Sequence, residues 1–390
     1  MNPFIYNIPT RVYFGPEEME HLGEELSRYG KRVLFVYDGD YIKSNGIYDL
    51  VMKAGRDYDL DITEFTNVRP NPRHTDCEEA IAICKEKNIE VVLGVGGGSV
   101  IDSSKAIAAG AVSDAPLWDL VIKKAPTEKA LPVIAMSTIS ATGSEMDSGA
   151  VITNESTFDK KVYSNPNLLP KATFLNPEYT FTVPKYQTAC GAVDIIAHVF
   201  EVYFSPSDDL YMLDTVAQGL VRTVLKYGPI AYNDPTNYEA RANLMWASPW
   251  AINHFIEYDK RHLWSMHPME HELSAYYDIT HGLGLAILMP RWLRFVKDEK
   301  SYPKFRGLGL YAFDLDRSLS DEEMADKVIE KIEEFSYKTL GLTSNLTDLG
   351  IDDSKFEEMA DKLTNNGTSY HAGFRPLYKE DIIKIYKSCL

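Results

Sequence analysis

The stretch WSMHPMEHELSAYYDITHGLGLAILMP, residues Trp264–Pro290, decides how the rest of the chain is interpreted. It holds three of the nine histidines. His267 and His271 are four residues apart and therefore share one face of a helix. His281 would lie about 15 Å beyond His271 on a continuous helix, too far for two ligands of one metal ion. A shared ion therefore requires a chain reversal near Asp278, and we expect a second helix to begin at His281.

An apolar segment upstream supplies further potential metal ligands. Residues Gly191–Val202, GAVDIIAHVFEV, are almost all apolar, which predicts a buried helix. Asp194 and His198 are four residues apart, so they share one face of this helix. A buried carboxylate is costly unless it is paired, hydrogen-bonded or bound to a metal. In one interpretation Asp194 pairs with a buried Lys or Arg and the histidines only pack. We favour a single site for Fe²⁺ or Zn²⁺ with four ligands, Asp194, His198, His267 and His281.

Composition places the chain among ordinary globular proteins and excludes several classes of function. The 390 residues are 45% hydrophobic and 25% charged, and this length suggests two domains or three. A net charge of −17 argues against nucleic acid or an anionic membrane as a partner. No apolar run reaches the roughly 18 residues of a membrane span, and no secretory signal is visible. The four scattered cysteines do not indicate a disulfide framework, so we expect a cytoplasmic location.

The two halves of the chain differ in the pattern of their hydrophobic residues. Up to about residue 180, strand patterns near 32–38, 60–69, 89–103 and 131–138 alternate with helical patterns such as 78–88. This alternation predicts a parallel sheet covered by helices. Helical patterns alone follow Pro184, at 185–204, 209–228, 236–257, 264–275, 282–297, 321–339, 354–364 and 379–388. We therefore predict an α/β domain over residues 1–182 and an all-helical domain over residues 183–390.

Two loops that follow buried strands have the composition of phosphate-binding loops. The first, GVGGGS over residues 94–99, precedes a predicted helix, whose free N–H groups and positive potential attract phosphate. The second, STISATGSEMD, spans residues 137–147. Each loop alone is also compatible with a plain strand-to-helix turn or a helix cap. Together, at the carboxyl ends of parallel strands, they predict a ligand-binding crevice in a doubly wound sheet.

These motifs together resemble the iron-containing alcohol dehydrogenase family. The resemblance rests on GGGSVIDSSKA over residues 96–106, on TGSE over residues 142–145, and on the spacing of Asp194, His198, His267, His271 and His281. The resemblance extends over nearly the whole chain. Within the family, the chain looks most similar to the branch of butanol dehydrogenases and NADPH-dependent aldehyde reductases. The resemblance implies a Rossmann-like nucleotide-binding domain and a helical domain that binds one divalent metal ion, an architecture shared with dehydroquinate synthase. It also implies a cleft between the two domains and usually a homodimer.

The resemblance further implies which residues lie along a nicotinamide dinucleotide. By position, Gly97, Gly98 and Ser99 contact its pyrophosphate. The other candidates for cofactor contact are Asn71, Asp102, Thr138, Thr142, Asp147 and Lys160. The sequence departs from the family at two of these places. Ile139 follows Thr138 where a second threonine is frequent, and Asp147 stands where Asn or Thr is usual.

Two acidic residues bear on the choice between NAD(H) and NADP(H). After the strand VLFVY the chain reads Asp38-Gly39-Asp40, where the resemblance places the adenosine ribose and where NADP-using relatives have Gly and Ser. A carboxylate accepts hydrogen bonds from ribose hydroxyls and repels the 2′-phosphate of NADP. We therefore expect a preference for NAD(H) over NADP(H), although the branch that the chain resembles commonly uses NADPH. Alternatively, Asp38 only starts a turn before Gly39.

The predicted activity is hydride transfer between NAD(P)(H) and a primary aliphatic alcohol or aldehyde, such as butanol or butanal. The metal ion polarises the substrate oxygen and the cofactor carries the hydride. His271, which is not needed as a ligand, either relays a proton to solvent or orients a ligand through a hydrogen bond. A metal- and NAD-dependent lyase and a polyol dehydrogenase are the alternatives of the same architecture.

Aromatic residues near the predicted ligands favour the dehydrogenase over the lyase. A lyase of this architecture binds a polyanionic substrate and needs Lys and Arg side chains at its site. The helices here offer apolar rings instead, namely Phe200, Tyr203, Trp246, Trp250, Phe255, Trp264 and Tyr276. A hydrolase that uses metal-activated water would leave the two glycine-containing loops without a role.

Overall fold

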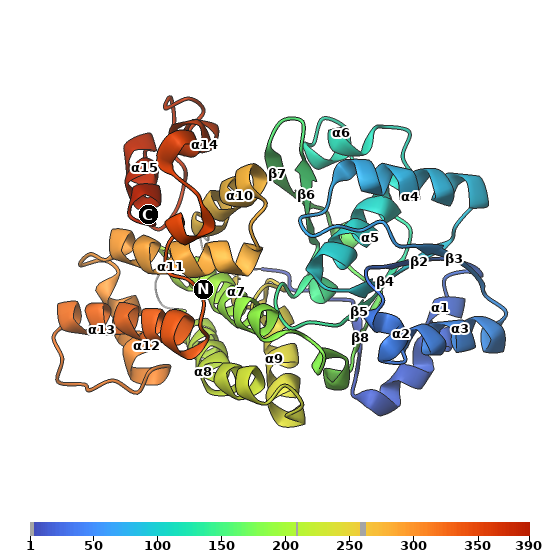
Figure 1. Cartoon of the computed structure of the whole chain (residues 1–390), viewed down its shortest axis with the longest axis horizontal. Helices are drawn as coiled ribbons and strands as arrows, with labels where there is room; N and C mark the ends of the chain where they lie inside the picture. The colour runs from blue at the N-terminus through green and yellow to red at the C-terminus, as the bar shows by residue number, and fades with distance from the viewer. Residues whose placement is uncertain (1–3, 208–209, 258–262) are drawn as a thin grey trace. The chain divides into compact units, whose positions relative to one another are not determined.

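A computed structural model describes residues 4–207, 210–257 and 263–390 of the chain (Figure 1). The chain is divided into two compact units, each discontinuous in sequence. The α/β unit comprises Asn7–Val183 and Pro235–Met245, and the helical unit comprises Met1–Tyr6, Pro184–Asp234 and Trp246–Leu390. Two continuous domains, residues 1–182 and 183–390, remain a prediction from sequence. The compact units differ from that division in two short segments. Met1–Tyr6 belongs to the helical unit, and Pro235–Met245 belongs to the α/β unit.

Six parallel strands form the central sheet of the α/β unit. They are β1 (Arg11–Phe14), β2 (Arg32–Tyr37), β3 (Asp61–Phe65), β4 (Val91–Gly96), β5 (Val133–Ser137) and β8 (Ala172–Leu175). Their order in the sheet is β1-β8-β5-β4-β2-β3, and every neighbouring pair is parallel. The predicted parallel sheet of a Rossmann-like domain is therefore confirmed.

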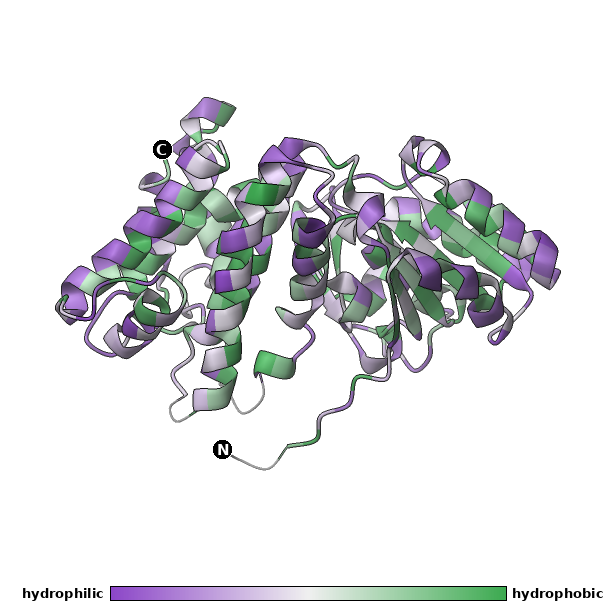
Figure 2. Cartoon of the chain, turned by 90° about the horizontal axis from the view of Figure 1, so that it is seen from below, coloured by the Kyte–Doolittle hydropathy of each residue, from purple (hydrophilic) through white to green (hydrophobic). Residues whose placement is uncertain are grey.

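Alternate residues of the strands belong to two separate hydrophobic cores, one on each face of the sheet. In β2, Leu34 and Val36 belong to the first core, while Val33 and Phe35 belong to the second. The helices that complete the first core are α4 (His74–Lys87), α5 (Gly98–Ala111) and α6 (Leu117–Val121), and those of the second are α1 (Leu22–Ser27) and α3 (Ile47–Tyr58). Figure 2 shows a mostly hydrophobic sheet beside helices of mixed hydropathy. The sheet thus buries both faces, as parallel sheets with crossover helices do.

The strand order reverses between β2 and β4. From β2 the chain passes to β3 at one edge of the sheet, and from β4 it passes to β5 on the opposite side. In doubly wound sheets, ligands bind outside the carboxyl ends of the strands at such a switch point. Asp38 follows β2 directly and Gly97 follows β4 directly. The topology therefore places the ribose candidate and the pyrophosphate candidates at neighbouring strand ends.

Several elements of the α/β unit were not predicted from sequence. β1 and β8 have only four residues each, too few for a clear periodicity. β6 (Gly149–Asn154) and β7 (Asp159–Ser164) form a separate antiparallel pair. The sequence of β7, DKKVYS, is charged and lacks the alternation of a half-buried strand.

Helices make up the regular structure of the helical unit. They are α7 (Lys185–Tyr203), α8 (Tyr211–Asn233), α9 (Tyr238–Trp250), α10 (Met266–Tyr277), α11 (His281–Val296), α12 (Tyr302–Tyr311), α13 (Asp321–Glu333), α14 (Phe356–Leu363) and α15 (Lys379–Lys387). The greater part of α9, residues 238–245, belongs to the α/β unit. Past Val183 the described residues form no named strand, which confirms the predicted helical C-terminal part. No described helix is long and apolar enough to cross a membrane.

Most predicted helix ranges agree with these bounds within a few residues. α12 was missed, and the range 236–257 was too long because α9 ends at Trp250. The range 321–339 contains α13 followed by a π-helical segment, Glu334–Thr339. Residue 209, the expected start of one helix, lies outside the described residues.

The chain reversal expected before His281 is present. α10 ends at Tyr277, and Asp278 adopts a left-handed conformation with φ of 51°. Thr280 is the N-cap residue of α11, which begins at His281. The turn therefore returns the chain so that His281 stands in the first turn of a new helix beside α10.

Candidate metal centre and cofactor loops

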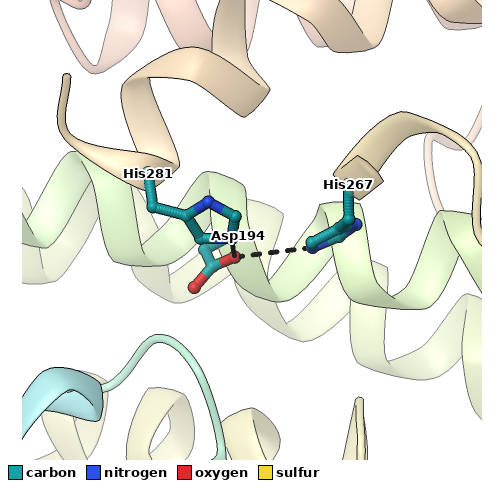
Figure 3. A group of neighbouring side chains, drawn as sticks. All are labelled: Asp194, His267 and His281. Carbon is teal, nitrogen blue, oxygen red and sulfur yellow. Dashed lines mark ion pairs between the residues drawn. The ribbon is translucent and has the colours of Figure 1, made fainter. Parts of the chain in front are cut away.

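Three helices of the helical unit carry the four predicted metal ligands. α7 carries Asp194 and His198, α10 carries His267 in its first turn, and α11 begins at His281. Oδ1 of Asp194 lies 3.7 Å from Nε2 of His198, 3.9 Å from Nε2 of His267 and 3.7 Å from Nε2 of His281. Figure 3 shows the carboxylate of Asp194 between the rings of His267 and His281. The structure brings these four residues together at one place.

The donor atoms at this place fit a cation better than they fit one another. Oδ1 of Asp194 and Nε2 of His267 are buried, and neither has a hydrogen-bond partner in the described part of the chain. Their separation of 3.9 Å is too long for a hydrogen bond. Two ligands of a tetrahedral ion with bonds of about 2.1 Å lie about 3.4 Å apart, which is close to this separation. A bound divalent ion therefore accounts for two buried polar atoms that would otherwise be costly.

The electrostatics of the centre also favour a cation. Burial raises the pKa of the Asp194 carboxyl, but the imidazoles of His198, His267 and His281 outweigh burial and hold this pKa below its usual range. Burial lowers the pKa of His267, but the carboxylates of Asp194 and Glu201 outweigh it and raise the pKa to about 9. The carboxylates thus stabilise positive charge at the centre, whether a proton or a metal ion carries it.

A second group of potential ligands, Glu270, His271 and His281, adjoins the first. It shares His281, whose Nδ1 donates a hydrogen bond to Oε2 of Glu270 while its Nε2 faces Asp194. Oε1 of Glu270 accepts a hydrogen bond from the hydroxyl of Ser274. Both oxygens of Glu270 are therefore engaged with protein donors, and the group around Asp194 is the better candidate for the metal.

Two buried glutamates at the metal centre were not predicted from sequence. Glu201 on α7 accepts hydrogen bonds from Nδ1 of His267 at 3.1 Å and from the backbone N–H of His267 at 2.6 Å. Glu270 on α10 accepts from Nδ1 of His281, and both glutamate side chains are fully buried. A signal was present, since Glu201 interrupts the same apolar segment as Asp194. Glu270 follows His267 by one helical turn, on the same face of α10.

His271 lies beside the predicted ligands. The centroid of its ring is 6.4 Å from that of His267 and 5.6 Å from that of His281, and the residue is buried. This position is compatible with both roles expected for His271, proton relay and orientation of a ligand, and both stay predictions.

Replacement of His271 by alanine separates the two roles. A relay through His271 predicts that His271→Ala keeps its metal while kcat falls by about 10²–10⁴-fold, the usual effect of losing a proton-transfer group. An orienting role predicts metal affinity that is weaker by about 10–100-fold. Metal analysis and kcat, measured on the same preparation, decide between them. An unchanged kcat with full metal content would exclude both roles.

α5 begins directly after β4, with the predicted pyrophosphate residues at its N-terminus. Gly97 is the N-cap residue, Gly98 and Ser99 begin the first turn, and no side chain caps the helix. A Cβ atom at Gly98 would lie 2.5 Å from Cγ2 of Thr142, so the close approach of the two loops requires glycine there. The N–H groups at this uncapped helix N-terminus suit a phosphate, and contact with the pyrophosphate stays a prediction.

Two of the expected cofactor residues are held together by a hydrogen bond. Nζ of Lys160, on β7, donates to Oδ1 of Asn71 at 2.9 Å, and both residues are buried. Asn71 has a left-handed backbone with φ of 53°, which asparagine tolerates better than most residues. The two residues are therefore neighbours, which is compatible with the prediction that both contact the same cofactor.

Asp102 and Asp147 have partners within the α/β unit. Asp102 accepts hydrogen bonds from the hydroxyl of Ser144 at 2.6 Å and from the backbone N–H of Val151 at 2.8 Å. Asp147 accepts from the backbone N–H of Gly149 at 2.8 Å. Burial raises the pKa of Asp102. These contacts hold the loop of residues 137–147 and β6 against α5, and direct contact of either aspartate with a cofactor stays a prediction.

The two aspartates expected at the ribose differ in their surroundings. Oδ1 of Asp38 accepts a hydrogen bond at 2.9 Å from the hydroxyl of Tyr41, in α2 (Tyr41–Ser44), and this hydroxyl lies 3.2 Å from Oγ1 of Thr138. Burial raises the pKa of Asp38. The side chain of Asp40 is 91% exposed and pairs with Lys43 at 2.9 Å. Asp38 is therefore fixed at the strand ends, whereas Asp40 is solvated.

Among the aromatic residues expected at the metal centre, Trp264 contacts a predicted ligand. The centroid of its ring lies 4.8 Å from that of His267. Phe200 instead packs edge-on against Phe204 in the core, and the hydroxyl of Tyr276 donates to a glutamate of α14. Residues two apart on a helix, such as His198 and Phe200, do not share a face, and contact of Phe200 or Tyr276 with a substrate stays a prediction.

The remaining aromatic residues make contacts with other rings or polar groups. Trp246 lies edge-on to Trp250, and Trp250 to Phe255, with centroids 5.5 and 5.6 Å apart. Tyr203 is buried and its hydroxyl accepts a hydrogen bond from Gln218. Contact of these residues with a substrate stays a prediction.

Two family models match the chain. The model described as "Iron-containing alcohol dehydrogenase" matches residues 9–177, and the one described as "Fe-containing alcohol dehydrogenase family, C-terminal" matches residues 188–390. The chain therefore belongs to the iron-containing alcohol dehydrogenase family, and the resemblance noted from its motifs is confirmed. It is an oxidoreductase of the metal-dependent alcohol dehydrogenase and aldehyde reductase class.

Individual relatives agree with this assignment over nearly the full chain. NADH-dependent butanol dehydrogenase A of Clostridium acetobutylicum is 45% identical over 387 residues, with 99% of each chain covered. The NADPH-dependent aldehyde reductase YqhD of Escherichia coli is 33% identical over 94% of each chain. The crystal structure of NADH-dependent butanol dehydrogenase A from Thermotoga maritima is 38% identical, covers 100% of this chain and 99% of that one, and has a TM-score of 0.93.

Proposed function

We propose that this alcohol dehydrogenase interconverts a short primary aliphatic aldehyde, such as butanal, and its alcohol with NADH as the hydride donor. The observation that carries the proposal is the convergence of three imidazole Nε2 atoms on the buried carboxylate of Asp194. The names of the relatives supply the substrate class, and those with identities of 40% or more are named butanol dehydrogenases.

In this proposal four residues of the centre hold the metal. A divalent ion, Fe²⁺ or Zn²⁺, bound by Asp194, His198, His267 and His281 supplies a Lewis acid for the oxygen of the alcohol or aldehyde. A bound nicotinamide would accept a hydride from the alcohol carbon in oxidation, when the hydroxyl proton is released, or donate one to the aldehyde carbon in reduction, when a proton is taken up. Trp264, next to His267, offers apolar surface to an aliphatic chain. His271 is the adjacent imidazole that could carry the proton.

NAD(H) is the proposed cofactor in preference to NADP(H). Four relatives with 40–45% identity are named as NADH-dependent, and the aldehyde reductase with 33% identity is named as NADPH-dependent. This agrees with the preference expected from Asp38 and Asp40. Asp38, which Tyr41 holds at the end of β2, is the residue best placed to meet the ribose.

The proposed function is tested by reduction of butanal with NADH before and after removal of metal with a chelator. NADH oxidation that requires butanal, is lost on chelation and returns with Fe²⁺ or Zn²⁺ is the expected result. Activity that persists in metal-free protein would contradict the metal-dependent mechanism. Turnover of a polyanionic substrate or a polyol, with butanal inert, would favour the lyase or the polyol dehydrogenase.

The length of the aliphatic chain provides a second prediction. Each methylene that is buried on binding contributes roughly 0.8 kcal/mol, so kcat/KM for straight-chain primary aldehydes should rise about threefold to fourfold per carbon until the pocket is filled. We expect the rise between three and roughly six carbons, by analogy with the family. A series from propanal to hexanal with NADH measures it. A higher kcat/KM for a carboxylated or phosphorylated aldehyde would overturn the aliphatic assignment.

Assembly and location are further parts of the proposal. Homologous enzymes of this architecture usually pair, so we propose a homodimer, which light scattering of the purified full chain measures directly. A cytoplasmic location is also proposed, on the basis of the four scattered cysteines.

A further inference from the structure

Two buried carboxylates hold two of the histidines at the metal centre. Nδ1 of His281 donates to Glu270, and Nδ1 of His267 donates to Glu201 at 3.1 Å. In both rings the other nitrogen, Nε2, faces Oδ1 of Asp194. We propose that Glu270 and Glu201 are positioning residues that fix these two imidazoles in the tautomer with a proton on Nδ1 and thereby set the affinity of the centre for its metal. This inference rests on the proposed metal centre.

The tautomer is what links these hydrogen bonds to metal binding. A neutral imidazole carries one proton, and a carboxylate can only accept, so each contact requires the proton on Nδ1. In the neutral ring the Nε2 atom then has a lone pair, which a metal ligand needs, and this atom already lies 3.7 or 3.9 Å from Oδ1 of Asp194. The carboxylate partner also fixes the plane of the ring.

The two glutamates also change the charge of the centre. The four ligands alone contribute one carboxylate, so a divalent ion would leave a net charge of about +1. Glu201 and Glu270 add two more buried carboxylates, each in contact with the ring of a predicted ligand. Together with Asp194, the centre then has three negative charges. Three negative charges against a charge of +2 favour retention of the ion, because opposite charges attract strongly in a buried site.

Glu201 has a second task, which makes it the less suitable target for an experiment. Its carboxylate accepts from the backbone N–H of Ser265 at 2.9 Å and of His267 at 2.6 Å. Ser265 is the N-cap residue of α10 and its own side chain does not cap the helix. Glu201 therefore caps α10 from a different helix, and its replacement would disturb folding as well as the imidazole of His267.

Glu270 has a simpler environment and a neighbour that allows an independent test. Gly284 lies one turn after His281 on α11, and a Cβ atom there would lie 2.7 Å from Oε1 of Glu270. The glycine thus leaves room for the carboxylate to reach the ring of His281. Gly284→Ala should displace the carboxylate while both Glu270 and His281 remain in the chain.

The experiment compares zinc affinity in the full-length parent and four variants, with zinc alone as the probe in competition with a chelator. Loss of an outer partner of a metal ligand typically weakens affinity 10–100-fold. We expect about 10-fold for Glu270→Gln, which keeps an acceptor oxygen but loses the charge, and up to about 100-fold for Glu270→Ala. Gly284→Ala should fall between the parent and Glu270→Ala.

Glu272→Gln is the matched control. Glu272 is also a buried carboxylate on α10, but it pairs with Lys362 at 3.9 Å. Residues two apart on a helix do not face the same side, so the control removes the same charge away from the ligand rings. We expect zinc affinity within twofold of the parent and a thermal shift of the metal-free protein similar to that of Glu270→Gln.

A spectroscopic measurement separates positioning from general stability. With Co²⁺ in place of Zn²⁺, the visible absorption bands report the ligand field, and we expect them to change in the Glu270 and Gly284 variants and not in Glu272→Gln. The proposal is overturned if the Glu270 variants and Gly284→Ala bind zinc as tightly as the parent, or if Glu272→Gln weakens binding equally. A parent that binds zinc but does not reduce butanal would contradict the proposed function alone, whereas a parent that binds no divalent metal would overturn both.

Discussion

His267→Ala is expected to lose its bound metal and to reduce butanal with NADH at a rate below detection. His267 is one of four predicted ligands, and its Nε2 atom is buried 3.9 Å from Oδ1 of Asp194. Loss of a ligand should cost more than the 10–100-fold in affinity that follows loss of an outer partner. Without His267, the buried carboxylate of Glu201 would also lose the hydrogen bond that it accepts from Nδ1 of this ring.

The measurement combines metal content, kcat and the melting temperature of the purified variant. Asp194→Ala, His198→Ala and His281→Ala should behave alike, since one ion needs all four ligands. His254→Asn is a suitable control from the same part of the chain, because His254 pairs with Glu257 and its left-handed backbone, with φ of 68°, tolerates asparagine. Full activity of metal-depleted His267→Ala would end the assignment of this centre.

Asp38→Gly is expected to shift the ratio of kcat/KM for NADH and NADPH by about 10–100-fold toward NADPH. A carboxylate about 5 Å from the 2′-phosphate of NADP would repel it by roughly 3 kcal/mol at an effective dielectric constant near 20. Solvent and salt reduce this value, which is why the expected shift is one to two orders of magnitude. Asp38 is part-buried and held by the hydroxyl of Tyr41, so screening is incomplete there.

Asp40→Ser provides the comparison for this experiment. The side chain of Asp40 is 91% exposed and paired with Lys43, so both the solvent and the lysine screen its negative charge. We expect this variant to change the cofactor ratio by less than about threefold, and the double variant to resemble Asp38→Gly. A parent that prefers NADPH would refute the role of Asp38. An unchanged ratio in Asp38→Gly would show that the aspartate does not meet the ribose.

The predicted metal ligands were accessible from sequence because the local geometry of helices carries the information. Asp194 and His198 are one turn apart in an apolar segment, and the chain reversal before His281 follows from the distance that a continuous helix would impose. Local helix geometry does not predict that Glu201 and Glu270 accept hydrogen bonds from the rings of His267 and His281. Glu201 meets His267 across 66 residues of sequence, and only tertiary packing decides that contact.

The cofactor loops, too, were only partly predictable from sequence. The glycine loop after β4 and the parallel direction of the strands follow from local patterns, whereas the order of the strands in the sheet was not predicted. The difference between Asp38 and Asp40 does not follow from local patterns either, because it depends on Tyr41 and on Thr138, which follows β5 almost a hundred residues later. The antiparallel pair of β6 and β7 also escaped, since the register of a charged strand is fixed by its partner rather than by its own hydrophobic pattern.

The exchange of short segments between the two units has a consequence for biosynthesis. The ribosome completes residues 7–183 long before it makes Pro235–Met245, which belong to the same unit. The α/β unit is therefore still incomplete while α7 and α8 of the helical unit are synthesised. A gene fragment that stops at Val183 would encode an incomplete unit, and cutting the chain between Val183 and Pro184 would not release two autonomous pieces. The halves should consequently melt together in a single cooperative transition rather than in two.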